Sequence, residues 1–316
     1  MAAGVDVGGT TTKACVIASG EIVATATFPT APDSPDGLGD LVVSAVHEAV
    51  SGLGGIGSLA AVGVGIPGQV SNGIVRNAAN LDIGEDGYDL GSHISAATGL
   101  VASVDNDTTV AGYGAFTQLR RHDPDLENLV YIGLGTGVSA GLILGARPYR
   151  GANGLAGEFG HVPMDTGVLC RCGARGCLET VMGAGALRAA WGEESDVFSA
   201  AVDGDPAAVE IVERALDHLA RAMWWLAATY DPDIFVIGGG IGTNNHGIGD
   251  AIADRWRVMA AESPLARRVL DPERVRMSDL EEPVGAFGAA LLAIDIADPV
   301  RKASQTATGR RDGSNE

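Results

Sequence analysis

Hydrophobic positions along the chain alternate between short apolar runs and helical stripes, a pattern typical of α/β proteins. Short apolar runs bounded by glycine or polar residues predict buried strands at 22–28, 60–66, 101–104, 129–134 and 233–237. Apolar positions three and four residues apart predict helices over 38–53 and 206–229. In the second helix the core stripe is expected to comprise Val209, Val212, Leu216, Leu219, Met223 and Leu226. The small residues of 285–293 predict a helix that packs closely on a sheet.

One pattern occurs twice: an apolar strand, a glycine turn and a second strand. The first copy has its turn at Gly8–Gly9–Thr10, between Val5–Val7 and Lys13–Ala18, and Asp6 lies inside the first strand. The second copy has its turn at Gly135–Thr136–Gly137. Backbone amides of such turns can face phosphates, so two of them could hold a triphosphate from both sides. A plain glycine hairpin is the alternative for each, but the repetition predicts a duplicated architecture.

Polar residues at strand ends are candidates for ligand contacts. Asp6 could hold Mg²⁺ through water. The strand at 101–104 is followed directly by Asp105, Asn106 and Asp107, and α/β sheets place their ligand contacts at such strand ends. Alternatively, Asp107 could cap a helix. The polar loop with Asn77 and Asn80 is either the rim of a polar ligand site or an ordinary turn.

Two further residues are expected to be structural. Cys15 alternates with apolar neighbours and is expected to be buried. His47 is expected to be an exposed helix residue rather than a ligand.

Composition restricts the class of protein. The 316 residues suffice for two lobes with separate cores, and 46% of them are hydrophobic. The net charge of −19 argues against nucleic acids and anionic membranes as partners. No apolar run has the length of a membrane span, and the start of the chain does not resemble a signal peptide. Clustered cysteines favour a reducing compartment, so a cytoplasmic location is expected.

The segment 156–180 carries the clearest chemistry. Cys170, Cys172 and Cys177 follow His161, and three thiolates with one imidazole form a ligand set that structural zinc prefers. The alternative is a set of reduced cysteines in an ordinary loop. Glu158 and Glu179 flank the cluster, so a closed zinc site is expected to hold these carboxylates and His161 in place.

Taken in order, these motifs resemble the ROK family of sugar kinases (repressor, open reading frame, kinase). The resemblance depends on the first glycine turn with Asp6 and Lys13, on Gly65–Gly68, Asn106–Asp107 and Gly135–Gly137, on Glu158–His161, on Cys170 to Glu179, and on the glycines at 238–240. It implies a two-lobed actin-like ATPase (ribonuclease H-like) α/β fold with duplicated domains and the active site in a cleft between them. The lobes are expected at 1–114, completed by a C-terminal helix at 285–299, and at 115–284. A disordered tail is expected at 300–316.

The resemblance also implies an ATP- and Mg²⁺-dependent hexose kinase that converts glucose to glucose 6-phosphate. Asp107 would be the general base. The sugar would be bound by Gly68, Asn80, Asn106, Asp107, Glu158, His161 and Glu179. The nucleotide would be bound by Asp6, Gly8, Gly9, Thr10, Lys13, Gly135, Thr136, Gly137, Gly239 and Gly240. Zinc would be bound by His161, Cys170, Cys172 and Cys177. Because Glu179 lies two residues from a metal ligand, removing zinc is expected to impair sugar binding more than nucleotide binding.

Some positions depart from the family pattern and leave the acceptor open. Thr108–Thr109 follow Asp107 where many members have Ala-Asn, and Ser139 and Ala140 replace glycines after the second turn. Another hexose, an N-acetylhexosamine or a cyclitol is therefore an alternative acceptor. A transcriptional regulator is disfavoured because the first strand begins at residue 4, and a non-catalytic sugar sensor because Asp107 is retained. A homodimer or larger homo-oligomer is expected from the family analogy and from Trp224 and Trp225.

Overall fold

The computed structural model describes residues 1–32, 34–78, 81–192, 196–261, 263–280 and 283–297. The chain divides into two compact units. Unit 1 comprises Met1–Gly114 and Glu281–Glu316, and unit 2 comprises Ala115–Leu280. The expected tail at 300–316 lies outside the described residues, as do residues 298–299 of the expected C-terminal helix.

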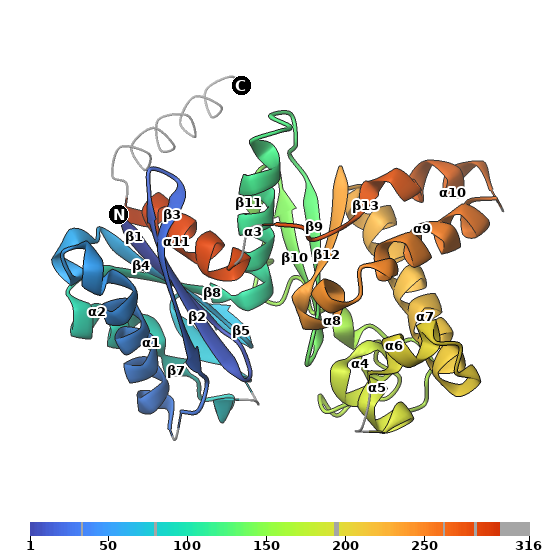
Figure 1. Ribbon diagram of the computed structural model, residues 1–316, viewed down its shortest axis with the longest axis horizontal. Helices are drawn as coiled ribbons and strands as arrows, with labels where there is room; N and C mark the ends of the chain where they lie inside the picture. Colours follow the sequence, from blue (N-terminus) through green and yellow to red (C-terminus); the bar gives the residue numbers. More distant parts are fainter. Residues whose placement is uncertain (33, 79–80, 193–195, 262, 281–282, 298–316) are drawn as a thin grey trace, which may run out of the picture. The chain divides into compact units, whose positions relative to one another are not determined.

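Unit 1 is built on a five-stranded sheet (Figure 1). Its strands, in spatial order, are β3 (Glu21–Pro29), β2 (Thr11–Ala18), β1 (Ala2–Val7), β4 (Ala61–Ile66) and β8 (Val101–Asn106). The pairs β3–β2 and β2–β1 are antiparallel, whereas β1–β4 and β4–β8 are parallel. The parallel strands bring their carboxyl ends to one edge of the sheet, which is where Asn106 ends β8.

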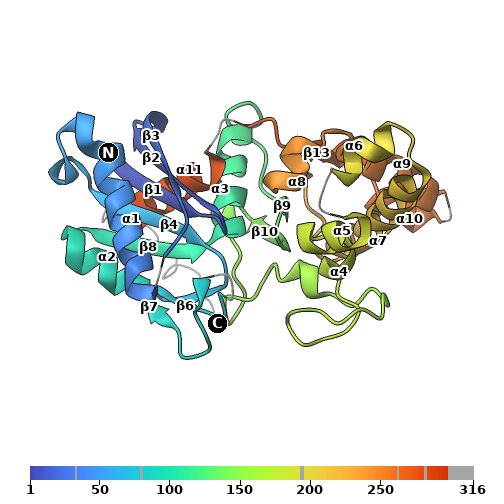
Figure 2. The same cartoon turned by 60° about the horizontal axis from the view of Figure 1, so that its bottom comes forward.

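Helices cover both faces of this sheet (Figures 1 and 2). On one face α1 (Pro35–Val50) and α2 (Leu90–Thr98) bury an aliphatic core against β1 and β4. On the other face α11 (Val284–Ala297) packs on β1, β4 and β8, as its small residues predicted. The approach is so close that a Cβ on Gly4 or Gly63 would lie 1.9 Å from a carbonyl oxygen of α11. The remaining helix, α3 (Asp107–Arg120), begins directly after β8.

A small sheet extends unit 1 and carries the expected sugar loop. It consists of β5 (Gln69–Ser71), β6 (Ile74–Arg76) and β7 (Tyr88–Asp89), in that order. Asn80 falls in the connection between β6 and β7 and lies outside the described residues.

Two expected structural residues of unit 1 are confirmed. Cys15 is fully buried, and this burial raises the pKa of its thiol to about 12. His47 is exposed on α1. The expected helix at 38–53 consists of α1 followed by a 3₁₀ turn, Ser51–Leu53.

Unit 2 repeats the topology of unit 1. Its sheet has the order β11 (Arg147–Pro148), β10 (Val138–Leu144), β9 (Leu129–Leu134), β12 (Ile234–Gly238) and β13 (Val275–Met277). The first two pairs are again antiparallel and the last two parallel. The duplication expected from the two glycine hairpins is therefore confirmed strand by strand, and so is the α/β fold class.

The helices of unit 2 pack around this second sheet. They are α4 (Glu179–Met182), α5 (Ala184–Trp191), α6 (Val197–Val202), α7 (Pro206–Tyr230), α8 (Gly239–Asn244), α9 (Gly247–Ala260) and α10 (Pro264–Val269). Further 3₁₀ turns lie at Ile56–Ser58 in unit 1, and at Phe159–His161 and Pro272–Arg274 in unit 2. Trp256 of α9 is fully buried and packs edge to face against the Phe235 ring, with 5.4 Å between the ring centroids. Among the described residues, no helix is both long and apolar enough to span a membrane.

The long helix predicted at 206–229 is confirmed as α7, which starts at Pro206 after an Asp205 cap. The predicted set of core residues on this helix was wrong at one position, Val209. Val209 is 39% exposed, because the neighbouring Ala208, which is fully buried, faces the core in the first turn of the helix.

Candidate functional site

In unit 1 the first glycine turn joins β1 to β2. The Gly8 amide donates to the Thr11 carbonyl oxygen at 3.0 Å, and a Cβ on Gly8 would lie 2.7 Å from that oxygen. Gly9 and Thr10 are exposed at the tip. Asp6 and Lys13 are cross-strand partners below it, so the turn, a carboxylate and an ammonium group lie together.

Asp6 also lies against α11. A Cβ on Gly285 would come within 2.4 Å of Asp6 Oδ2, so only glycine leaves room for the carboxylate here. One partly exposed carboxylate suits Mg²⁺, which keeps most of its water ligands.

At the carboxyl end of β8, in the same sheet, Asn106 caps α3. Its Oδ1 accepts hydrogen bonds from the amides of Thr108 at 3.0 Å and Thr109 at 3.2 Å. Its Nδ2 donates to the carbonyl oxygen of Gly68 at 3.2 Å. The helix cap that the sequence left open for Asp107 is thus provided by its neighbour.

Asp107 is the first residue of α3 and is only partly exposed. Its Oδ1 accepts hydrogen bonds from the amide of Thr108 at 2.8 Å and from the Thr108 hydroxyl at 3.3 Å. Burial raises the pKa of the Asp107 carboxyl above its usual 3.8, and the hydrogen bonds from Thr108 offset this only in part. A carboxyl with a raised pKa next to solvent is suited to accept a proton.

Gly68 has a left-handed backbone with φ of +106°. A Cβ there would lie 2.7 Å from the Arg76 carbonyl oxygen, so the turn after β4 requires glycine. Because Asn106 binds its carbonyl group, Gly68 is held beside the start of α3.

In unit 2 the second glycine turn joins β9 to β10. The Gly135 amide donates to the Gly137 carbonyl oxygen at 3.0 Å, and Thr136 is exposed between them. Gly239, with φ of +77°, packs its backbone against Leu134, and a Cβ on Gly135 would lie 4.0 Å from the Gly240 amide nitrogen. The structure therefore brings the expected nucleotide-binding glycines of this unit together.

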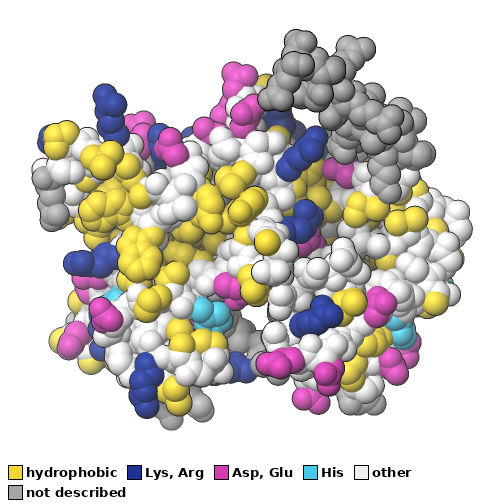
Figure 3. Space-filling model, turned by 180° about the vertical axis from the view of Figure 1, so that it is seen from behind, with side chains coloured by type: hydrophobic (Ala, Val, Ile, Leu, Met, Phe, Trp, Pro, Cys, Tyr) yellow, Lys and Arg dark blue, Asp and Glu magenta, His cyan; other side chains and the backbone are white. Residues whose placement is uncertain are grey.

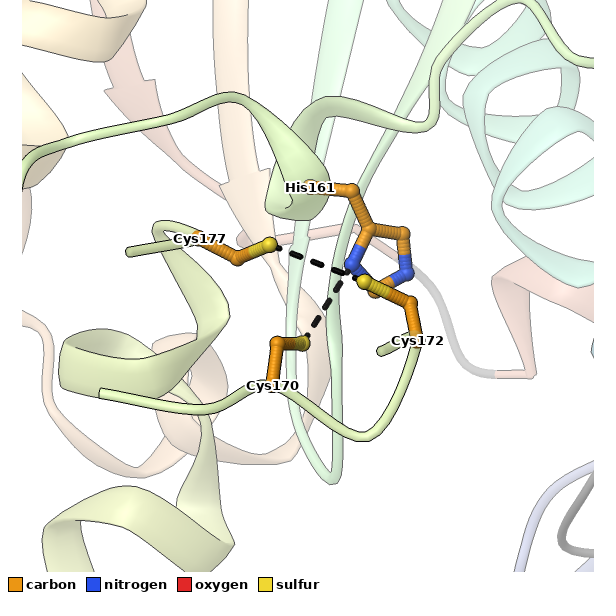
Figure 4. A group of neighbouring side chains, drawn as sticks. All are labelled: His161, Cys170, Cys172 and Cys177. Atoms are coloured by element: carbon orange, nitrogen blue, oxygen red, sulfur yellow. Dashed lines mark hydrogen bonds between the residues drawn. The ribbon is translucent and has the colours of Figure 1, made fainter. Parts of the chain in front are cut away.

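His161 and the three cysteines form one cluster (Figure 4). His161 Nδ1 lies 3.7 Å from Cys170 Sγ, and Cys172 Sγ lies 3.7 Å from Cys177 Sγ. All four donor atoms lie within 4.8 Å of one another. Tetrahedral zinc with Zn–S bonds of about 2.3 Å separates two sulfurs by about 3.8 Å, so these residues fit the metal.

His161 also faces Glu158. Its Nε2 lies 3.8 Å from Glu158 Oε2, on the side of the ring opposite the sulfur-facing Nδ1. One imidazole therefore lies between the cysteine cluster and an exposed carboxylate.

Glu179 occupies an unexpected position. It is the first residue of α4, and its Oε2 accepts a hydrogen bond from the Val138 amide at 3.1 Å, directly after the second glycine turn. Sequence reasoning missed Val138 because a backbone amide leaves no sequence signal. It also missed Thr108, which is the hydrogen-bond donor to Asp107.

The chain is similar to known proteins over nearly its whole length. The model of the ROK family matches residues 2–296. The glucokinase of Streptomyces coelicolor is 33% identical over 330 residues, which cover 94% of this chain and 98% of that protein. The N-acetylmannosamine kinase of Escherichia coli K12 is 30% identical over 304 residues, 92% of this chain and 97% of that protein.

A solved structure is also similar. It is the crystal structure of a ROK family glucokinase from Streptomyces griseus in complex with glucose and AMPPNP. The TM-score is 0.74 at 29% identity, covering 93% of this chain and 99% of the other. Because the family model matches nearly the whole chain, and because the glucokinase relative is 33% identical over 94% of it, the chain belongs to the ROK family.

Proposed function

We propose that this protein is an ATP-dependent hexose kinase that transfers the γ-phosphate of ATP to the 6-hydroxyl of glucose. The proposal depends mainly on the environment of Asp107 at the start of α3. Its carboxyl is partly buried and has a raised pKa, it accepts hydrogen bonds from Thr108, and it follows Asn106, which caps the helix. The glucokinase relatives and the glucose and AMPPNP complex support the same reaction.

In this mechanism Asp107 accepts the proton of the attacked hydroxyl as that oxygen bonds to the γ-phosphorus of ATP and ADP leaves. Phosphoryl transfer depends on alignment and charge neutralisation more than on covalent chemistry, so one well-placed base suffices. Asp107 has two oxygens, and Thr108 binds one of them, Oδ1. The base would therefore act through Oδ2.

The sugar's other hydroxyls would be bound by Gly68, Asn80, Asn106, Glu158, His161 and Glu179. Asn106 donates to the Gly68 carbonyl oxygen and also hydrogen-bonds the Asp107 carboxyl, so it would lie beside both the base and the sugar. Val138 binds Glu179 Oε2, so Oε1 is the acceptor for the sugar. His161 would bind through Nε2, because Nδ1 faces the sulfurs.

ATP would be bound by both glycine turns. Gly8, Gly9, Thr10 and Lys13 of unit 1 would contact phosphates, as would Gly135, Thr136 and Gly137 of unit 2, with Gly239 and Gly240 behind the second turn. Asp6 would hold Mg²⁺ through water, and this ion, when bound, neutralises charge on the phosphate oxygens. His161, Cys170, Cys172 and Cys177 would hold a structural zinc ion.

The decisive experiment is a coupled ATP-consumption assay across glucose, mannose, N-acetylmannosamine, N-acetylglucosamine and myo-inositol, with NMR of the product to locate the phosphate. Glucose should give the highest kcat/KM and a 6-phosphate. A higher kcat/KM for N-acetylmannosamine would favour the second candidate, which the similarity to the E. coli enzyme supports. Sugar binding without ADP formation would instead indicate a non-catalytic sensor.

Location and assembly complete the proposal. The protein would be located in a reducing cytoplasm, because none of its four cysteines forms a disulfide bond. We expect a homodimer or larger homo-oligomer, because hydrophobic side chains gather on part of the surface (Figure 3). In unit 2, Trp225 is 51% exposed, and Tyr149 is 46% exposed beside Tyr230, with which its ring packs. Light scattering of the purified protein tests this, and a monomer at micromolar concentration would contradict it.

A further inference from the structure

Glu179 connects two parts of unit 2 that the proposed function treats separately. It lies two positions after the cysteine ligand Cys177 and is the first residue of α4. Its Oε2 accepts the Val138 amide hydrogen at 3.1 Å, and Val138 is the first residue of β10. A Cβ on Gly137 would lie 2.7 Å from this oxygen, so the carboxylate reaches the turn only because that residue is glycine.

The other end of the glycine turn is bound to the first residue of the next helix, α5. The Gly183 amide donates to the Glu179 carbonyl oxygen at 3.0 Å and ends α4. The next amide, Ala184, donates to the Gly135 carbonyl oxygen at 2.9 Å. The two sides of the turn at Gly135–Gly137 are therefore held by Glu179, which begins α4, and by Ala184, which begins α5.

This helix is attached to the metal-binding segment. The Leu178 amide donates to the Val162 carbonyl oxygen at 3.0 Å, and the Thr180 hydroxyl donates to the Cys177 carbonyl oxygen at 2.7 Å. Cys177 and Pro163 form an isolated antiparallel bridge. Through these contacts the cysteine cluster sets the position of α4.

The segment before the cysteines contacts the same strand from another direction. A Cβ on Gly160 would lie 2.1 Å from the Val138 carbonyl oxygen, and the Ala140 amide donates to Gly157 at 2.8 Å. The start of β10 is thus in contact with Gly157 and Gly160, which both precede His161, and with Glu179. Few arrangements of the turn are compatible with all these contacts.

We propose that Glu179 is a positioning residue that couples metal occupancy of the His161–cysteine cluster to the shape of the Gly135–Gly137 turn. Metal at the cluster orders α4, and the Glu179 carboxylate then holds the Val138 amide and the peptide planes before it. The metal therefore strengthens nucleotide binding even when no sugar is present. This last consequence depends on the proposed function, and it replaces the expectation that zinc removal affects mainly the sugar.

The most direct test is hydrogen exchange at Val138, in protein without sugar or nucleotide, with zinc loaded or removed by a chelator. In the wild-type chain zinc removal should raise the Val138 exchange rate at least tenfold, while amides of α9 stay protected and exclude global unfolding. In Glu179→Ala the amide should exchange fast already, and zinc removal should add less than twofold. Equal exchange of Val138 with and without zinc in the wild type would overturn the proposal.

Calorimetry with a non-hydrolysable ATP analogue provides the second readout, again without sugar. Glu179→Ala should weaken binding about fivefold to tenfold, as expected for one lost hydrogen bond. Glu179→Gln should stay within twofold of the wild type, because its amide oxygen still accepts from Val138. Gly185→Ala is the matched control. It adds one methyl group close to the turn and should leave nucleotide affinity unchanged, because no atom lies within 4 Å of the added Cβ.

Two results would count against the coupling: unchanged nucleotide affinity in Glu179→Ala, or a loss in Glu179→Gln equal to that in Glu179→Ala. If Glu179→Ala does not fold, Gly137→Ala displaces the carboxylate sterically and should raise Val138 exchange to the same extent. Failure of the proposed function looks different. It would appear as absence of phosphoryl transfer to every sugar while the zinc dependence of Val138 exchange persists.

Discussion

The side-chain amide of Asn106 donates from Nδ2 to the carbonyl oxygen of Gly68 at 3.2 Å, while its Oδ1 caps α3. One side chain thus joins the turn after β4 to the start of the helix that carries Asp107. Gly68 cannot be replaced without strain, and Thr108 binds the Asp107 carboxylate from the helix side. Asp107 therefore has little freedom to move, which is the condition for an efficient base.

Asp107→Asn should lower kcat about a thousandfold, since an amide cannot accept the proton. Circular dichroism and sugar affinity should stay close to the wild type, because an asparagine oxygen can still accept from Thr108. Turnover within tenfold of the wild type would contradict the assignment of the base.

The same substitution should make the protein more stable at neutral pH. The folded pKa of Asp107 is raised above 3.8, so the wild type loses stability from this group as the pH rises from 3.8 through the raised pKa. Urea denaturation over a pH series should show no advantage for Asp107→Asn below pH 3.8 and a constant one above the folded pKa. An advantage that shrinks with rising pH has the wrong sign for this explanation.

The pH profile of the wild-type enzyme should depend on the same carboxyl. Only the deprotonated base accepts a proton, so kcat/KM should fall as the pH decreases through the Asp107 pKa. Because burial raises that pKa, the midpoint should lie above 3.8. A midpoint at or below 3.8, in protein that remains folded, would exclude Asp107 as the titrating group.

Metal analysis of freshly purified protein should find about one zinc ion per chain. Cys177→Ser should lose the metal and reduce thermal stability, because Cys177 is a buried member of the four-ligand cluster. Cys15→Ala is the matched control and should keep the metal, since Cys15 lies in unit 1, within β2. Wild-type protein without zinc, or loss of zinc in both variants, would contradict the site.

Gly63→Ala should destabilise the protein by about 3 kcal/mol or more, because its Cβ would lie 1.9 Å from the Ala289 carbonyl oxygen of α11 and the two backbones would have to separate. Gly57→Ala, where no atom lies within 4 Å, should change the free energy of unfolding by less than about 0.5 kcal/mol. Chemical denaturation measures both. Equal effects would mean that the contact of α11 with β4 does not depend on glycine.

Much of the architecture follows from local patterns. The helix α7 was predictable because apolar residues three and four positions apart favour a helix with one buried face. The two hairpins were predictable because glycines after an apolar run favour a tight turn between two strands. The expected strands at 60–66 and 129–134 correspond to β4 and β9. Val209 is exposed although it fits the periodicity, since spacing does not decide which of two neighbouring apolar residues, Ala208 or Val209, faces the core.

Residue types and spacing alone were enough to predict the family and to propose the His161–cysteine cluster as a zinc site and Asp107 as the base, because cysteine thiolates, a strand-end carboxylate and ordered glycine motifs have few other uses in this combination. Only the tertiary structure could decide that Asn106 rather than Asp107 caps α3, and that Glu179 binds the Val138 amide. The physical reason is that both facts depend on hydrogen bonds with backbone groups. Every residue except proline carries the same N–H and C=O groups, so their partners are selected by folding and leave no trace in the order of side chains.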